Sequence, residues 1–126
     1  MGHNYYEFQH KTKIMAGELA LEKIPFELKG LGVRKPMILS DAGLAKTGTL
    51  QIVLNALEEG DIQPSCIDTD IPRDSSLSCV NRLAIEYKNK KCDSIIAVGG
   101  GSVLDTAKGV RMVLSQGTKD IVHLAG

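Results

Sequence analysis

The segment most suited to chemistry is Gly99-Gly100-Gly101-Ser102, which follows an apolar run and precedes an amphipathic stretch. Glycines carry no Cβ, so a ligand can come close to the main chain. The unpaired N–H groups at the start of a helix, together with the helix dipole, favour a negative charge there. The order of strand, glycine turn and helix therefore predicts a pyrophosphate site, to which Ser102 adds a hydroxyl donor. The alternative is a tight turn that binds nothing.

The glycine spacing differs from the common nucleotide-binding fingerprints. It matches neither the Gly-x-Gly-x-x-Gly pattern of dinucleotide-binding folds nor the Gly-x-x-x-x-Gly-Lys-Ser/Thr pattern of the P-loop. The prediction of a phosphate site therefore depends on the strand expected before the glycines and on the helix expected after them.

Asp41 is a second candidate, because it stands at the carboxyl end of a strand expected over residues 37–40. Ligands of open α/β sheets bind outside the carboxyl ends of the strands, where an acidic side chain can accept hydrogen bonds from a ribose diol. Such a carboxylate would repel a 2′-phosphate on that ribose. From its position alone, Asp41 is equally suited to cap a helix or to form a turn.

Asp105 and Lys108 are spaced i and i+3 in the helix expected after the glycines. Side chains at this spacing are neighbours on a helix surface, so the two residues could form an ion pair with each other. The alternative is that one of them reaches the ligand.

The cysteines and histidines show no metal-binding pattern. No Cys-x-x-Cys or His-x-x-x-His pair occurs, and we expect reduced thiols that are buried or half-buried. The residues concerned are Cys66, Cys79, Cys92, His3, His10 and His123.

Composition narrows the possible partners. The 15 basic and 15 acidic residues cancel, so no uniform basic field is available for nucleic acid or for an anionic membrane surface. The longest apolar runs are far shorter than the roughly 20 residues of a membrane span. No secretory signal is visible at the N-terminus, so a cytoplasmic location is the default expectation.

Short apolar runs alternate with amphipathic stretches along the chain. Strands are expected over residues 37–40, 62–68 and 94–98, the second weakened by Pro64 and therefore suited to a sheet edge. Helices are expected over residues 47–59, 76–91 and 102–116, with Asp74 or Ser75 capping the second. Their apolar stripes comprise Leu50, Val53, Leu54 and Leu57; Leu77, Val80, Leu83, Ala84 and Tyr87; and Val103, Ala107, Val110 and Val113 or Leu114.

This alternation predicts an α/β fold with a Rossmann-like parallel sheet and helices on both faces. The first 35 residues are less regular. Residues 5–15 suit an extended strand or a hairpin, and Leu21, Ile24, Leu28 and Leu31 suggest a helix in which Pro25 must lie in the first turn. No linker or repeat divides the chain, so residues 1–126 are expected to form one domain.

Several segments together resemble the iron-dependent (group III) alcohol dehydrogenase family. The most specific is Ala97-Val98-Gly-Gly-Gly-Ser-x-x-Asp105-x-Ala107-Lys108. Two others are Lys13-Ile14-x-x-Gly17 and Ile38-Leu39-Ser40-Asp41-x-Gly43-Leu44-Ala45-Lys46-x-Gly48. Three segments depart from the family pattern: Leu19 stands where many members have a second glycine, Pro72-Arg73-Asp74-Ser75 lacks a second proline, and residues 120–123 replace a segment that usually ends in Asp-Tyr.

The resemblance implies an N-terminal NAD(P)-binding domain of the dehydroquinate synthase-like type. It implies that Gly99 to Ser102 hold the pyrophosphate and that Asp41 faces the adenosine ribose, which favours NAD over NADP. Asp105 and Lys108 would then lie near the nicotinamide end. It also implies a helical C-terminal domain that holds Fe²⁺ or another divalent metal through an aspartate and histidines. We expect that domain to be absent, since the sequence stops at Gly126 and none of its histidines matches a family ligand.

The resulting hypothesis is the cofactor-binding part of an NAD(P)-dependent, metal-dependent alcohol dehydrogenase, seen as a fragment or a truncated product. A complete enzyme would interconvert a small alcohol and its aldehyde or ketone. One alternative is a similar part of a glycerol dehydrogenase or a dehydroquinate synthase. Another is a nucleotide-binding or assembly module without catalysis. A domain without its partner domain is also expected to expose apolar surface and to self-associate as a homo-oligomer.

Overall fold

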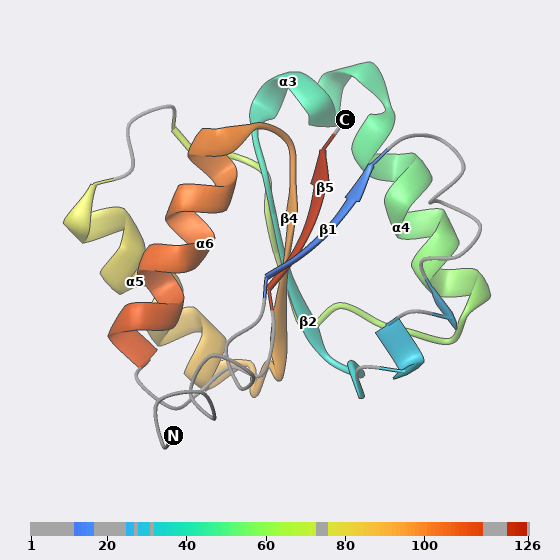
Figure 1. Ribbon diagram of the computed structural model, residues 1–126. Coiled ribbons are helices and arrows are strands. Elements are labelled where there is room, and N and C mark those ends of the chain that lie inside the picture. The colour runs from blue at the N-terminus through green and yellow to red at the C-terminus, as the bar shows by residue number, and fades with distance from the viewer. Residues whose placement is uncertain are drawn as a thin grey trace, which may run out of the picture.

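The computed structural model describes residues 12–16, 25–26, 28–30, 32–72, 76–114 and 121–125. Within these ranges, strands and helices alternate along most of the chain (Figure 1). The elements are β1 (Thr12–Ala16), β2 (Pro36–Ser40), α3 (Ala42–Thr47), α4 (Thr49–Glu59), β3 (Cys66–Asp68), α5 (Leu77–Asn89), β4 (Ser94–Val98), α6 (Gly101–Leu114) and β5 (Ile121–Ala125).

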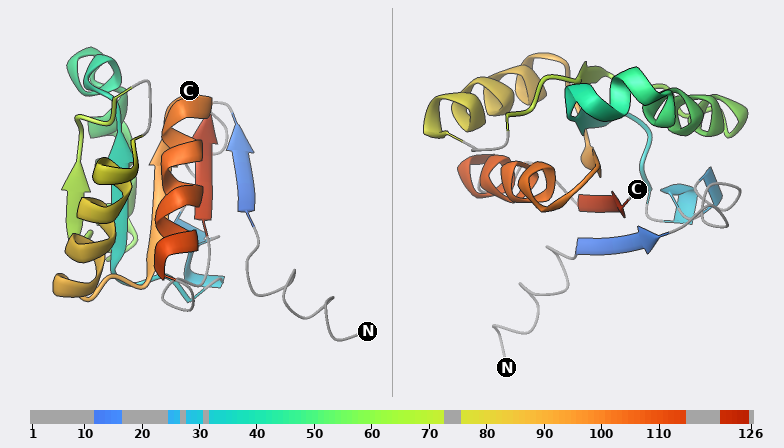
Figure 2. Two further views of the ribbon diagram at one scale, coloured as in Figure 1. Left: turned by 90° about the vertical axis from the view of Figure 1, so that its left-hand side faces the viewer. Right: turned by 90° about the horizontal axis from the view of Figure 1, so that it is seen from above.

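The strands form one parallel sheet of five strands in the order β1-β5-β4-β2-β3. Figure 2 shows the strands side by side in this order, with the carboxyl ends of β2, β4 and β5 at the same edge. The strand β4 lies at the centre, so the glycine turn that follows it emerges in the middle of that edge. The parallel α/β fold expected from the sequence is confirmed.

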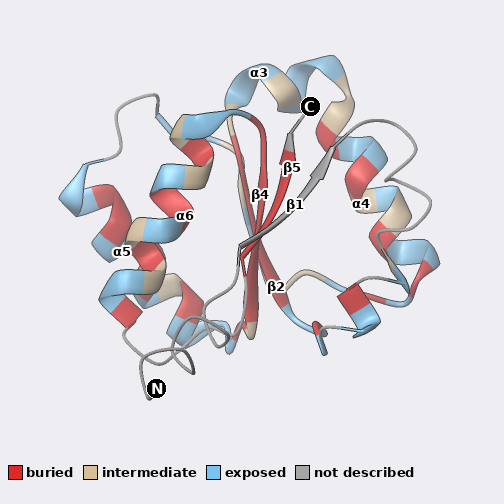
Figure 3. Ribbon diagram, in the orientation of Figure 1, coloured by how far each residue is buried: buried red, intermediate tan, exposed pale blue. Residues whose placement is uncertain are grey.

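Helices cover both faces of the sheet. The helices α5 and α6 lie against one face and α4 against the other, while α3 stands over the carboxyl ends of the strands (Figure 1). Side chains of β4 alternate between the two cores, with Ile95 and Ala97 facing α5 and α6, and Ile96 and Val98 facing α4. Figure 3 shows the resulting buried layer, in which every residue of β2 and β4 is buried.

The segment after β2 differs from the sequence prediction. A single helix was expected over residues 47–59, but the structure has the short helix α3 before it and a break at Gly48 between α3 and α4. Gly48 has φ = 85°, a left-handed conformation that ends α3 and lets α4 start in a new direction. The apolar stripe of α4 is confirmed, because Leu50, Val53 and Leu57 are buried.

The strand expected over residues 62–68 is shorter than predicted. The structure pairs only Cys66–Asp68 with β2, and Pro64 lies before the strand. The predicted edge position is correct, since β3 is the last strand of the sheet. Proline cannot donate a ladder hydrogen bond, which explains why pairing starts after it.

Two details of α5 differ from the predictions, and in α6 the structure decides between two predicted alternatives. The N-cap of α5 is Ser76, whose hydroxyl accepts a hydrogen bond from the Cys79 N–H at 3.2 Å. The expected caps, Asp74 and Ser75, lie outside the described residues. Leu77 is 73% exposed and does not belong to the buried stripe, because it opens the helix on its outer side. In α6, Leu114 is the buried residue, whereas Val113 is 43% exposed.

No strand was predicted over residues 121–125, but the structure has β5 there, next to the central strand β4. It inserts between β4 and β1, with Ala97 opposite His123 and Val98 opposite Leu124. β1 overlaps the end of the segment expected to be extended, residues 5–15, and runs one residue beyond it. It pairs with β5 in parallel. The predicted positions Leu21, Ile24, Leu31 and Gln116 lie outside the described residues.

None of the helices in the described ranges has the length and apolarity that a membrane crossing needs.

Candidate functional site

The glycine turn starts with Gly99, which is buried and has φ = 138°. Its N–H donates a hydrogen bond to the Leu124 carbonyl oxygen at 3.0 Å. A Cβ on Gly99 would stand 3.2 Å from Leu44 Cδ1 and 3.3 Å from both Asp41 Oδ2 and Val103 Cγ2. The residue at this position must therefore be glycine, both for its backbone conformation and for the space around it.

The next two glycines, in contrast, face open space. A Cβ added at Gly100 or Gly101 would meet nothing within 4 Å. The first hydrogen bond of α6 runs from the Leu104 N–H to the Gly100 carbonyl oxygen at 3.3 Å. The N–H groups of Gly100, Gly101 and Ser102 have no partner among the described residues. A group of free amides with room in front of it, at a helix N-terminus, fits a phosphate.

Asp41 connects this turn to α3. It caps α3, because its Oδ1 accepts a hydrogen bond from the Leu44 N–H at 2.8 Å. Its other oxygen, Oδ2, lies on the side of Gly99. The sequence left open whether Asp41 caps a helix or faces the ligand. The structure establishes the cap and leaves Oδ2 available at the glycine turn.

A pocket of about 530 Å³ occupies this place at the carboxyl edge of the sheet. It combines residues from the ends of three neighbouring strands and from α3. The lining residues are Asp41, Gly43, Leu44, Thr47, Gly99, Gly100, Gly101 and His123.

His123 is one of four lining residues that were not predicted as site residues, together with Gly43, Leu44 and Thr47. It is 8% exposed, and its Nε2 lies 2.7 Å from the Gly99 carbonyl oxygen. The available signal was the apolar run of residues 121–124, which could have been interpreted as a further strand. Such a strand would have placed His123 at the carboxyl edge.

Two buried polar atoms in the described part of the chain have no hydrogen-bond partner, namely Ser40 Oγ and His123 Nδ1. Both belong to residues near the carboxyl ends of strands at this same edge. Buried polar groups are usually paired, and exceptions cluster where a structure has a function to perform.

The remaining predicted site residues lie on α6 but not in the pocket lining. Ser102 is half-buried, and its carbonyl oxygen accepts a hydrogen bond from the Thr106 hydroxyl at 2.9 Å. Asp105 and Lys108 are exposed, and no ion pair joins them in the described structure. The structure thus brings Asp41 together with the three glycines and leaves Ser102, Asp105 and Lys108 to one side.

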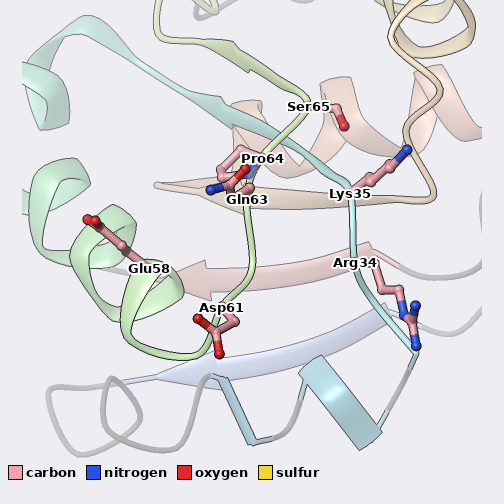
Figure 4. A pocket seen from close by; sticks show the side chains of 7 residues that line it. All are labelled: Arg34, Lys35, Glu58, Asp61, Gln63, Pro64 and Ser65. Carbon is pink, nitrogen blue, oxygen red and sulfur yellow. The ribbon is translucent and has the colours of Figure 1, made fainter.

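A second pocket, of about 670 Å³, lies at the amino ends of the strands (Figure 4). Arg34 and Lys35 precede β2, while Glu58 and Asp61 come from the end of α4 and the turn after it. In Figure 4 these side chains spread around the pocket without converging on one point. It is larger than the pocket at the glycine turn, but its charges are mixed and exposed, so it is the weaker candidate for a ligand site.

The described residues do not fit a metal site. No group of three or more His, Cys, Asp or Glu side chains in the described ranges could hold an ion. The nitrogen Nε2 of His123 is already engaged by the Gly99 carbonyl oxygen. The three thiols are free, with Cys79 and Cys92 buried and Cys66 half-buried, as predicted.

Comparison with known proteins identifies the family. The model of the family described as iron-containing alcohol dehydrogenase matches residues 11–125. This chain belongs to that family. The family match agrees with the parallel sheet and with the glycine turn after its central strand.

Each relative aligns with most of this chain, but the aligned region is only a part of the relative's own length. The 4-hydroxybutyrate dehydrogenase of Cupriavidus necator is 30% identical over 75% of the chain and 24% of its own length. The choline dehydrogenase of Bacillus subtilis is 32% identical over 84% of the chain and 26% of its own length. The crystal structure of NADH-dependent butanol dehydrogenase A from Thermotoga maritima superposes with a TM-score of 0.71 at 33% identity, over 79% of this chain and 25% of that one. The chain thus spans about a quarter of the length of these family members.

Proposed function

We propose that this chain is the NAD-binding part of an iron-containing alcohol dehydrogenase. The observation that carries the proposal is the open glycine turn between β4 and α6, where free main-chain amides stand beside the carboxylate of Asp41. A dinucleotide needs both features, because its pyrophosphate requires N–H donors and its ribose hydroxyls require an acceptor.

Different residues of this chain would bind different parts of the dinucleotide. The amides of Gly100, Gly101 and Ser102 would bind the pyrophosphate without any cationic side chain, supported by the positive end of the α6 dipole. Asp41 Oδ2 would accept hydrogen bonds from the adenosine ribose while Oδ1 continues to cap α3. Asp105 and Lys108 are exposed further along α6 and outside the pocket lining, so they would meet only a nicotinamide end that extends beyond this pocket. When bound, NAD supplies the acceptor for a hydride from the alcohol carbon.

The same arrangement favours NAD over NADP. A 2′-phosphate on the adenosine ribose would come next to the Asp41 carboxylate, and the two negative charges would repel each other. Within the pocket lining of the described structure no lysine or arginine offsets that charge. The butanol dehydrogenase compared above is described as NADH-dependent, which supports this preference.

The substrate of the complete protein is proposed to be a small alcohol or the corresponding carbonyl compound. The relatives are named for 4-hydroxybutyrate, choline and butanol, which have in common a hydroxyl on a short carbon chain. The described residues offer no set of ligands for iron, so a metal would have to be held by other parts of the protein. This absence also favours, as a second candidate, a nucleotide-binding module that performs no chemistry by itself.

The test is a calorimetric titration with NAD of the wild-type chain and of two variants. Gly100→Val places a branched side chain where the phosphate would lie, and Gly30→Val is the control at an exposed glycine with the same open surroundings. We expect binding by the wild-type chain and by Gly30→Val, and no binding by Gly100→Val. A urea unfolding curve shows whether Gly100→Val is still folded.

Two results would contradict the proposal. If NAD gives no heat with the folded wild-type chain, the glycine turn is only structural. If Gly100→Val binds NAD as well as the control does, the phosphate lies elsewhere. Oxidation of 1-butanol by the complete protein, assayed with added ferrous ion, separates the two candidates, because only an alcohol dehydrogenase shows turnover there.

A further inference from the structure

Three successive glycines have no side chains that could fix the orientation of their peptide planes. Glycine adopts positive and negative φ about equally readily, so each plane can turn over at low cost. The orientation matters, because one face of a peptide presents an N–H and the opposite face a carbonyl oxygen. We propose that His123 is a positioning residue, which holds the peptide between Gly99 and Gly100 with its N–H toward the phosphate. This inference rests on the proposed function.

The hydrogen bond from His123 fixes the direction of this peptide. A carbonyl oxygen only accepts, so Nε2 of His123 must carry the proton that it donates to the Gly99 oxygen at 2.7 Å. The peptide bonds of the described chain are all trans, so the Gly100 N–H points opposite to the Gly99 carbonyl, away from the imidazole. If the peptide turned over, its carbonyl oxygen would face the phosphate and repel it.

Two residues of β5 form hydrogen bonds with the peptide groups on either side of Gly99. The Leu124 carbonyl oxygen accepts from the Gly99 N–H at 3.0 Å, and the neighbouring residue, His123, donates to the Gly99 carbonyl. The register of β5 against β4 places His123 opposite Ala97, two residues before the turn. Two consecutive peptide planes are thereby held by one strand, while the next glycines remain open to a ligand.

The histidine achieves this at a cost to the fold. With its proton on Nε2, the imidazole presents a bare Nδ1, which is buried and has no hydrogen-bond partner among the described residues. An unpaired buried acceptor destabilises a protein, whereas an apolar side chain of similar size would not. A residue kept only for packing would avoid this penalty. An apolar residue at this position removes the unpaired Nδ1 but also leaves the Gly99 carbonyl oxygen without its donor, so the two effects on stability offset each other while the affinity for NAD falls.

The test compares His123→Leu with His123→Gln. Leucine has a similar volume but no donor, and glutamine has an amide N–H that can donate to the Gly99 carbonyl oxygen. We expect His123→Leu to weaken NAD binding about tenfold, which corresponds to about 1.4 kcal/mol, with little change in the Tm. We expect His123→Gln to restore most of the lost affinity. The ¹³C chemical shift of the Gly99 carbonyl, measured without ligand, should change in the leucine variant and stay near the wild-type value in the glutamine variant.

Several outcomes would overturn the inference. If His123→Leu binds NAD like the wild-type chain, the turn does not depend on the imidazole. If the leucine variant loses Tm and affinity together and glutamine restores neither, His123 is only part of the packing. An unchanged Gly99 carbonyl shift in His123→Leu would mean that the hydrogen bond is absent in solution. Failure of the wild-type chain to bind NAD is a different result, because it removes the proposed function itself.

Discussion

The carboxylate of Asp41 links the start of α3 to the backbone of Gly99. One oxygen accepts the hydrogen bond that caps α3, at 2.8 Å from the Leu44 nitrogen, and the other lies 3.3 Å from the point where a Cβ on Gly99 would stand. The end of β2 and the end of β4 can come this close because residue 99 has no side chain. Helix capping and the candidate ligand site therefore depend on the same pair of residues.

The first prediction concerns Gly99→Ala. The variant should lose about 1–3 kcal/mol of unfolding free energy, because alanine is strained at φ = 138° and its Cβ would crowd Leu44, Asp41 and Val103. Urea unfolding followed by circular dichroism measures the loss. The matched control is Gly100→Ala, for which the structure leaves room. Equal stability of the two variants would be inconsistent with the described conformation of the turn.

The second prediction separates the two roles of Asp41. Asp41→Ala removes the cap of α3 and should cost about 1 kcal/mol of stability, whereas Asp41→Asn keeps a capping oxygen and should cost much less. Both variants remove the negative charge, so both should bind NADP more tightly relative to NAD. The measurements are urea unfolding and calorimetric titration with each dinucleotide. An unchanged preference for NAD in both variants would count against the ribose role.

The third prediction concerns Asp93, which joins the segments before β2 and β4. Its Oδ2 accepts hydrogen bonds from the N–H groups of Arg34 and Lys35, at 2.9 Å and 3.1 Å. Asp93→Ala leaves both donors without this acceptor and should lower the unfolding free energy by about 1 kcal/mol, because these amides are exposed and water partly replaces the carboxylate. NAD affinity should not change, because the residue lies at the opposite end of the strands from the glycine turn. A neutral effect on stability would mean that water replaces the carboxylate.

The fourth prediction is a pH dependence of stability that comes from Cys92. Burial, followed by the negative charges of Cys66 and Asp93, raises the pKa of the Cys92 thiol from 9.0 to about 12. The folded protein therefore keeps a proton that the unfolded chain releases above pH 9. This contribution to stability is complete below pH 9 and is lost as the pH rises toward 12, with a slope of at most about 1.4 kcal/mol per pH unit.

The measurement for Cys92 is urea unfolding at pH 8 to 11, in the wild-type chain and in Cys92→Ala. We expect the difference in unfolding free energy between the two proteins to shrink as the pH rises. A difference that stays constant over this range would show that the thiol titrates alike in the folded and unfolded states.

The sequence by itself determined the features that depend on neighbouring residues. The apolar run of β4, the glycines after it and the stripe on α4 predict local conformation, because the spacing of side chains decides which face is buried. The same local pattern was misleading at Leu77, whose exposure depends on where α5 starts. It also missed α3, because Asp41, Ala42 and Gly43 are as typical of a turn as of a capped helix.

Only the tertiary structure decided how distant segments meet at the site. The insertion of β5 beside β4 brings His123 to Gly99, 24 residues away in the chain, and no local pattern encodes that contact. The link from Asp93 to Arg34 spans 59 residues and is equally invisible in the sequence. The physical reason is that strand order follows from packing the whole sheet between its helices, so that residues alike in sequence context can lie at the centre or at the edge.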